Sequence, residues 1–242
     1  MTKRLQRSYL AALGIPVWQL RSRAAPAAVA DVAAAAVTPA ESSFVGGEIA
    51  AAPDAAERTW QTLAAAVRAC TLCALHETRT QTVFGVGRRD ADLLVIGEAP
   101  GADEDAKGEP FVGRAGQLLN AMLLAIGLER GAVYIANILK CRPPNNRDPQ
   151  PAEAAACTPY LQQQIALVAP RAILAVGRIA AQWLLQSDAP IGRLRGRVFH
   201  YGPTNTPLVV TYHPAYLLRS PLAKATAWQD LCMVKELLSR ES

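Results

Sequence analysis

The sequence lacks any apolar run of the roughly 18–20 residues that a helix needs to cross a lipid bilayer, so it predicts no membrane-spanning segment and no membrane partner. Its first residues, MTKRLQRSYLAALGIPVW, contain several basic residues and a short apolar patch. They have neither the longer apolar centre nor the small-residue cleavage site of a secretory signal. We therefore expect a cytoplasmic protein.

The common phosphate-binding motifs are also missing. The chain has no G-x4-G-K-S/T loop and no G-x-G-x-x-G fingerprint. Its Gly-rich stretch, GEAPGADEDAKGEPFVGRAGQLL (97–119), instead carries acids that would repel phosphate. Glu98 is better placed to act on water or to stabilise positive charge. For Asp103 and Asp105 the sequence favours a simpler role, which is to cap the helix that follows.

Acidic residues are scarce in the C-terminal part of the chain. The net charge is only +5, but the stretch from Arg171 to Lys224 contains seven Lys or Arg residues and only one acid, Asp188. Such a stretch is either a solvated basic face or a surface for a polyanion such as DNA.

Large apolar residues are few in residues 24–56, where fifteen of 33 positions are alanine and three are proline. This composition indicates a low-complexity linker. The basic segment 1–23 before it could form a short amphipathic helix that docks onto the main domain or onto a protein partner. We expect the folded domain to span residues 57–242.

Four apolar runs within this domain predict buried strands at 92–97, 132–138, 172–177 and 207–212. They are near-continuous rather than alternating, which is typical of parallel strands covered on both faces. Helical patterns occupy 57–70, 114–127, 151–168, 178–186 and about 222–240. The alternation predicts a three-layer α/β/α sandwich with a central, mainly parallel four-stranded sheet, and 198–201 as an additional edge strand.

Polar loops follow three of these strands, and in parallel sheets such loops converge on one crevice. Asn137 ends the second strand, where it is either a structural amide or a reader of a base edge. Phe111 either anchors its loop or offers a flat face to a planar ligand such as a base. His213 begins the loop HPAYLLR, whose apolar residues and Arg219 could form a wedge that enters DNA while the arginine holds phosphate.

The chain has five cysteines, an odd number, and disulfides are rare in cytosolic proteins, so we expect no disulfide framework. Cys70 and Cys73 form a C-x2-C pair, and fifteen residues separate Cys141 from Cys157. These four could bind zinc or an iron–sulfur cluster, or could be unrelated buried residues, and their spacing does not decide. Cys232 is best interpreted as a core residue of the last helix.

Three motifs together resemble the family 4 uracil-DNA glycosylases, the iron–sulfur type. They are GEAPG with the following PFVGRAGQLL, then NILKCRPPNNRDP, and finally HPAYLLR, and the resemblance covers about residues 57–240. It implies a uracil-DNA glycosylase-like fold and a DNA repair enzyme that excises uracil. It also implies a [4Fe–4S] cluster held by Cys70, Cys73, Cys141 and Cys157, with no diffusible cofactor.

The resemblance further implies roles for the pocket. Phe111 stacks on the flipped uracil, Asn137 binds the pyrimidine edge and rejects cytosine, and Gly97 belongs to the same uracil-binding set. His213 lies near uracil O2, where negative charge develops. Glu98 and Glu104 are the catalytic acids, which orient water or stabilise the oxocarbenium-like sugar. Family 1 enzymes carry Asp and Tyr where this chain has Ala99 and Gly101, so the water-activating residue and the thymine filter stay open.

The expected partner is uracil-containing DNA, single- or double-stranded, bound by a monomer that works at the bacterial nucleoid. The enzyme would flip the nucleotide out of the stack. Leu217 or Leu218 would fill the gap, and Arg219 and Arg195 would hold the backbone. Two alternatives are weaker. Covalently trapping relatives carry a basic, His-containing insertion that is absent after PFVGRAGQLL, and a non-catalytic polymerase accessory would not need Glu98, Asn137 and His213 together.

Overall fold

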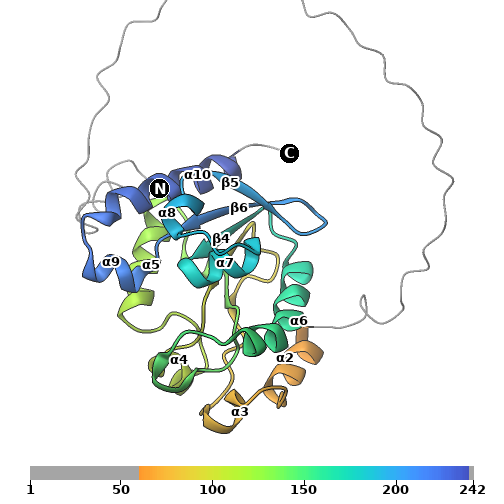
Figure 1. Ribbon diagram of the computed structural model, residues 1–242. Coiled ribbons are helices and arrows are strands. Elements are labelled where there is room, and N and C mark those ends of the chain that lie inside the picture. Colours follow the sequence, from red (N-terminus) through yellow and green to blue (C-terminus); the bar gives the residue numbers. More distant parts are fainter. Residues whose placement is uncertain (1–59, 240–242) are drawn as a thin grey trace, which may run out of the picture. The chain divides into compact units, whose positions relative to one another are not determined.

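Six strands form one sheet at the centre of residues 60–239, the residues that this computed structural model describes. The strand order is β1-β3-β2-β4-β6-β5, and the last three strands of this order are labelled in Figure 1. The strands are β1 (Val86–Gly87), β2 (Leu93–Gly97), β3 (Tyr134–Asn137), β4 (Ala172–Val176), β5 (Val198–Tyr201) and β6 (Thr206–Thr211). The predicted segments 1–23 and 24–56 lie outside the described residues.

The inner strands β3, β2, β4 and β6 are mutually parallel and are the four strands predicted from the apolar runs. β5 pairs antiparallel with β6, which confirms the additional edge strand. β1 adds a second antiparallel edge beside β3. It was not predicted, because two residues are too short to leave a pattern in the sequence.

Two helical layers cover the sheet, because alternate residues of each strand point to opposite faces. Val95 and Leu174 pack with α5, α9 and α10, whereas Ile96 and Ile173 pack with α3, α6, α7 and α8. The helices are α2 (Trp60–Arg68), α3 (Leu75–Thr78), α4 (Ala102–Lys107), α5 (Arg114–Ala125), α6 (Pro151–Val168), α7 (Arg178–Leu185), α8 (Ile191–Leu194), α9 (Pro214–Arg219) and α10 (Ala223–Ser239). The three-layer α/β/α prediction is confirmed.

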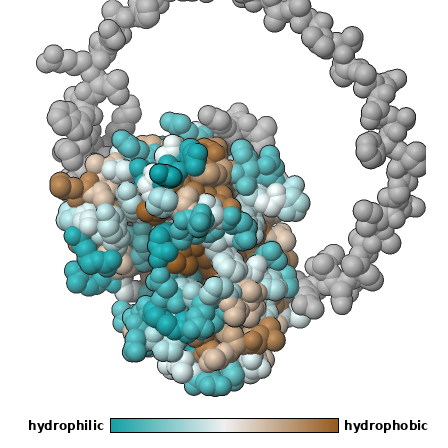
Figure 2. Space-filling view, viewed as in Figure 1, coloured by the Kyte–Doolittle hydropathy of each residue, from teal (hydrophilic) through white to brown (hydrophobic). Residues whose placement is uncertain are grey.

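On the face shown in Figure 2 the surface is mostly polar, with apolar side chains in a recess near its middle and in smaller areas towards its edges. Within residues 60–239, no helix combines the length and the apolar character needed to cross a membrane.

Two neighbouring leucines of the short helix α9, which the sequence could not distinguish, differ in their exposure to solvent. Leu217 is 1% exposed and packs in the core with residues of α5 and α10. Leu218 is 37% exposed. Leu217 therefore cannot fill a gap in DNA without leaving the core, and of the two predicted wedge residues only Leu218 is placed to do so.

This difference predicts unequal effects on stability. Leu217→Ala should lower the free energy of unfolding by about 2–5 kcal/mol, because it leaves a cavity in the core. Leu218→Ala should change the same quantity by less than about 0.5 kcal/mol. Urea denaturation of both variants measures this, and equal losses would contradict the placement of α9.

Candidate functional site

A pocket of about 470 Å³ opens where the carboxyl ends of the parallel strands meet. Gly97 at the end of β2 is in register with Asn137 at the end of β3, so the loops after both strands reach the same place. The loop after β6 completes the wall. The pocket is lined by Glu98, Ala99, Pro100, Gly101, Glu104, Phe111, Ala115, Asn137, Pro143, Asn146, Arg147, His213, Ala215 and Arg219.

Asn137 has a buried oxygen with no partner. The residue is 2% exposed, and its side-chain Oδ1 accepts no hydrogen bond from the described residues. Its backbone carbonyl, by contrast, accepts a 2.7 Å hydrogen bond from Lys140 Nζ. An unpaired buried acceptor costs about 1–3 kcal/mol, so this oxygen favours a ligand that donates an N–H group.

His213 is the N-cap of α9, and this position determines which ring nitrogen carries the proton. Its Nδ1 accepts a 3.2 Å hydrogen bond from the backbone N–H of Ala215, so the neutral ring is protonated on Nε2. Burial, with help from the charge of Arg219, lowers the pKa of His213 to about 4, although Glu104 opposes the shift. His213 is therefore a neutral donor at physiological pH.

Glu98 lines the same pocket with a carboxylate that makes no hydrogen bond or ion pair among the described contacts. Burial raises the pKa of Glu98 to about 7, and the nearby negative charge of Asp148 adds to the shift while Arg178 opposes it. A carboxylate with such a pKa can accept a proton near neutral pH.

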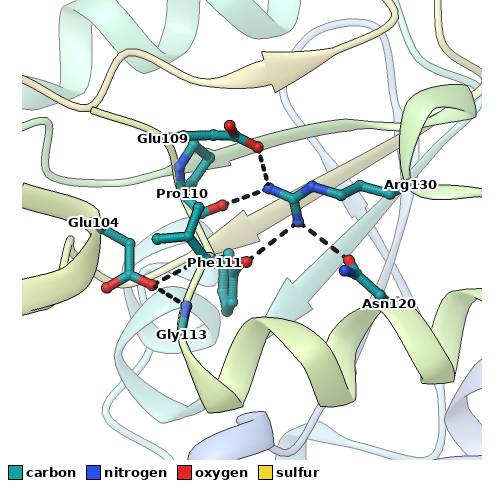
Figure 3. Close-up of polar contacts among 8 residues, drawn as sticks. Glu104, Glu109, Pro110, Phe111, Gly113, Asn120 and Arg130 are labelled. Atoms are coloured by element: carbon teal, nitrogen blue, oxygen red, sulfur yellow. Dashed lines mark hydrogen bonds and ion pairs between the residues drawn. The ribbon is translucent and has the colours of Figure 1, made fainter. Parts of the chain in front are cut away.

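Glu104 uses both of its oxygens to hold the loop. Oε2 accepts from the N–H of Gly101 at 3.1 Å, and Oε1 accepts from Val112 at 3.0 Å and Gly113 at 3.3 Å (Figure 3). Gly113 is the N-cap of α5. These contacts make Glu104 a brace for the pocket wall, and the predicted catalytic role stays a prediction.

Asp103 and Asp105 lie with Glu104 in the first turn of α4, a helix that was not predicted. The helix dipole favours acids at this end. Asp105 is buried and accepts from the backbone N–H of Thr80 at 3.0 Å. Capping of the following helix α5 thus falls to Glu104 rather than to Asp103 or Asp105.

Phe111 is held with its ring against the pocket. Its φ of 54° lies in the left-handed region that residues other than glycine rarely adopt. A Cβ added at Gly97 would come within 2.7 Å of the ring atom Cζ, so only glycine fits beneath the ring. The Phe111 and His213 rings lie 5.7 Å apart with a tilt of 31°.

The four predicted cysteine ligands line one small cavity. Cys70 and Cys73 lie between α2 and α3, Cys141 follows β3, and Cys157 is in α6. Within residues 60–239, no three His, Cys, Asp or Glu residues are close enough to hold a single metal ion. Cys232 is half-buried on α10, away from this cavity.

Two cations adjoin the cysteine cavity. Arg79 Nη1 donates to Cys141 Sγ at 3.0 Å, and the fully buried Lys140 lines the same cavity. Burial raises the pKa of the Cys141 and Cys157 thiols, while Arg79 and Lys140 oppose the shift. The positive charges therefore offset part of the cost of forming thiolates there.

Arg195, which was predicted to hold the DNA backbone, is mostly buried and pairs with an acid. Its Nη2 donates to Asp230 Oδ1 at 2.8 Å and to the carbonyl of Thr226 at 2.6 Å, and its side chain is only 12% exposed. Asp230 is completely buried. An arginine committed to a buried carboxylate cannot hold a DNA backbone, which leaves Arg219 as the predicted backbone contact that lines the pocket.

Sequence reasoning missed several residues around these two sites. Arg147 and Asn146 line the pocket, and Asn146 follows Asn145 with both in left-handed conformation. The PPNN sequence was a signal for such a turn, since Asn tolerates this conformation. Lys140 and Arg79 left no signal, because a buried cation is not distinguishable from an exposed one in the sequence.

Comparisons with known proteins agree on one family. The profile of the Uracil DNA glycosylase superfamily matches residues 84–232. A type-4 uracil-DNA glycosylase of Archaeoglobus fulgidus is 43% identical over 182 residues, which cover 72% of this chain and 91% of the relative. Relatives of the same description from Pyrobaculum aerophilum (42%, covering 69% of this chain and 88% of the relative) and Thermotoga maritima (40%, 72% and 92%) are also similar.

The raised pKa of Glu98 predicts a pH-dependent effect of Glu98→Gln on stability. Because the folded state binds this proton more tightly than the unfolded chain, Glu98 destabilises the fold increasingly as pH rises from about 4.5 to about 7. The glutamine variant should therefore resist urea better than wild type at about pH 8 and equally at about pH 4. Equal midpoints at both pH values would show that this carboxylate is not desolvated.

Proposed function

Because the chain belongs to the Uracil DNA glycosylase superfamily, and within it to the type-4 enzymes, we propose that it excises uracil from DNA. It is a hydrolase of the N-glycosidic bond whose products are free uracil and an abasic site. The observation that carries the proposal is the unpaired, buried Oδ1 of Asn137, which lines the same pocket as the ring of Phe111 and the neutral His213.

Recognition of the base rests on the Asn137 amide. Uracil presents an N3–H donor beside the O4 acceptor, and an amide has a matching acceptor and donor side by side. Cytosine has an acceptor at N3 and a donor at N4, so it would leave the buried Oδ1 facing a lone pair. Phe111 supplies the flat face on which the base stacks, and Gly97 leaves room for the ring beneath it.

Departure of the base rests on His213. When the bond from C1′ to N1 breaks, its electron pair stays on the base, and the negative charge spreads onto O2. A neutral His213 donates from Nε2 to this oxygen and stabilises the anion without being consumed as an acid.

Addition of water rests on Glu98. Water adds to C1′ of the sugar cation and gives up a proton, which the Glu98 carboxylate can accept because its pKa is about 7. The same negative charge stabilises the cationic sugar before water adds. Glu104 contributes by holding the loop that carries Glu98 and Phe111.

The DNA contacts follow from α9. Leu218 would enter the stack where the flipped nucleotide leaves it, and Arg219 would hold the neighbouring phosphate. The duplex or single-strand preference, the monomeric state and a protein partner for residues 1–23 stay predictions.

The cysteines support the proposal of a [4Fe–4S] cluster at this cavity. Four cysteine sulfurs line it, and the cations Lys140 and Arg79 would offset the negative charge of four thiolates. A single zinc ion needs its sulfurs about 2.3 Å from one centre, whereas a cubane cluster places each thiolate on a different iron. The arrangement supports the cluster, which would tie α2 and α3 to α6 and to the segment after β3.

The activity is tested with purified protein and an oligonucleotide that carries one uracil, followed by alkali. Cleavage should occur at the uracil and not in oligonucleotides with thymine or cytosine at that position. No cleavage in single strands, U·A pairs or U·G pairs would overturn the proposal.

Asn137→Ala should reduce the single-turnover rate of uracil release by about 10²–10³-fold, a loss typical of a lost transition-state hydrogen bond. Binding of uracil-free DNA, measured by fluorescence anisotropy, should stay unchanged, since phosphate contacts dominate it. Normal uracil release would remove Asn137 from the pocket.

The purified protein should be brown and contain about four irons per chain, as the cluster requires. Cys73→Ser should lose most of the iron and the visible absorption. Cys232→Ser is the matched control and should keep both, because Cys232 does not line the cavity. Colourless wild-type protein with stoichiometric zinc and no iron would refute the cluster.

A further inference from the structure

One arginine outside the pocket makes four contacts, three with the loop that carries Phe111 and one with α5 (Figure 3). Arg130 lies in a 3₁₀ turn, η1 (Arg130–Ala132), before β3. Its Nη2 donates to the carbonyl of Pro110 at 2.6 Å and to Glu109 Oε1 at 2.9 Å. Its Nη1 donates to the carbonyl of Phe111 at 3.3 Å and to Asn120 Oδ1 on α5 at 3.2 Å. We call this set of contacts the Arg130 clamp.

The backbone that the clamp holds is strained. Phe111 has a φ of 54°, a conformation that costs a residue other than glycine about 1–3 kcal/mol and persists only where its surroundings impose it. Its carbonyl also packs directly against Gly116 of α5, where any added Cβ would collide with it. Arg130 binds the carbonyl of Pro110, just before the strained residue, and the carbonyl of Phe111 itself.

Glu104 holds the loop from the opposite direction. Its Oε1 accepts from the N–H groups of Val112 and Gly113, the two residues after Phe111. Figure 3 shows the Phe111 segment between the Glu104 carboxylate and the Arg130 guanidinium. Backbone donors are thus fixed by an anion on one side, and backbone acceptors by a cation on the other.

The consequence is a fixed ring. The Phe111 side chain is 7% exposed and lies against Gly97 and His213, so a change in its backbone would move the ring relative to Asn137 as well. Of the four residues that Arg130 binds, only Phe111 lines the pocket.

We propose that Arg130 is a positioning residue for uracil excision: its clamp keeps Phe111 in the left-handed conformation and so prepares the aromatic face on which the base stacks. This inference rests on the proposed function, in which Phe111 is the stacking wall. Arginine suits the role because its planar fork can bind several acceptors in different directions. The ion pair with the half-exposed Glu109 is a minor part, since exposed pairs contribute little.

The test is a double-mutant cycle between Arg130→Met and Phe111→Ala, read as the single-turnover rate of uracil release and as inhibition by free uracil. Arg130→Met alone should lower the rate and weaken uracil inhibition, each by about tenfold to a hundredfold, as expected for a misplaced binding group. In the Phe111→Ala background it should change both by less than about twofold, because the ring that it positions is gone.

Two further variants separate positioning from stability and charge. Arg130→Lys keeps the charge and the ion pair with Glu109 but loses the forked guanidinium group. Its urea denaturation midpoint should stay near that of wild type, while its rate of uracil release should fall nearly as far as that of Arg130→Met. Arg88→Met breaks an exposed ion pair with Asp90 away from the pocket and should leave rate and inhibition unchanged.

Three results would overturn the inference while leaving the proposed function intact: full activity in Arg130→Met, full activity in Arg130→Lys, or equal losses from Arg130→Met with and without the Phe111 ring. Failure of the wild-type protein to release uracil at all would instead contradict the proposed function, and the positioning role with it.

Discussion

The ammonium group of Lys140 is buried between the base pocket and the cysteine cavity, and both depend on it. Its Nζ donates to the carbonyl of Asn137 at 2.7 Å and to Gln164 Oε1 on α6 at 2.6 Å. A buried charge has to be paired or hydrogen-bonded, so Lys140 fixes β3 and α6 relative to each other. Burial lowers its pKa to about 7, whereas the thiols of Cys157 and Cys141 oppose that shift. The end of β3 that presents Asn137 is therefore tied to the residues that we propose to hold a cluster.

The pocket itself accumulates features that are unfavourable for folding. Asn137 has an unpaired buried oxygen, Phe111 has a strained backbone, and Glu98 has a desolvated carboxylate. Such costs gather at functional sites, where the surrounding structure imposes them. In our account each one serves the reaction: the oxygen awaits the uracil N3–H, the strained residue presents its ring, and the carboxylate is ready to accept a proton. The parallel sheet supplies the rigid frame that holds them together.

Much of this architecture could be predicted from the sequence, because long buried strands and helices leave strong apolar patterns. The four parallel strands and helix α6, predicted at 151–168, are examples. Short elements such as β1, α4 and α9 leave no comparable pattern. Leu217 and Leu218 could not be separated, since the direction of each side chain depends on the packing of α9 against α5.

Charged residues show the limit of sequence reasoning more clearly. Arg195 was counted as part of a basic surface, but its partner Asp230 lies 35 residues further along the chain and is visible only in the fold. Arg130 was not noticed, because two of its four acceptors are backbone carbonyls that have no signature in the sequence. Pocket residues that belong to sequence motifs could be predicted from the sequence. The residues that hold them in place could be identified only in the structure.

The central claim, that this pocket receives uracil, is tested most directly by a crystal structure of the protein with free uracil. The account predicts the base stacked on the Phe111 ring, with N3–H and O4 on the Asn137 amide and O2 at Nε2 of His213. Uracil bound at another place, or bound in this pocket without contact to Asn137, would contradict it.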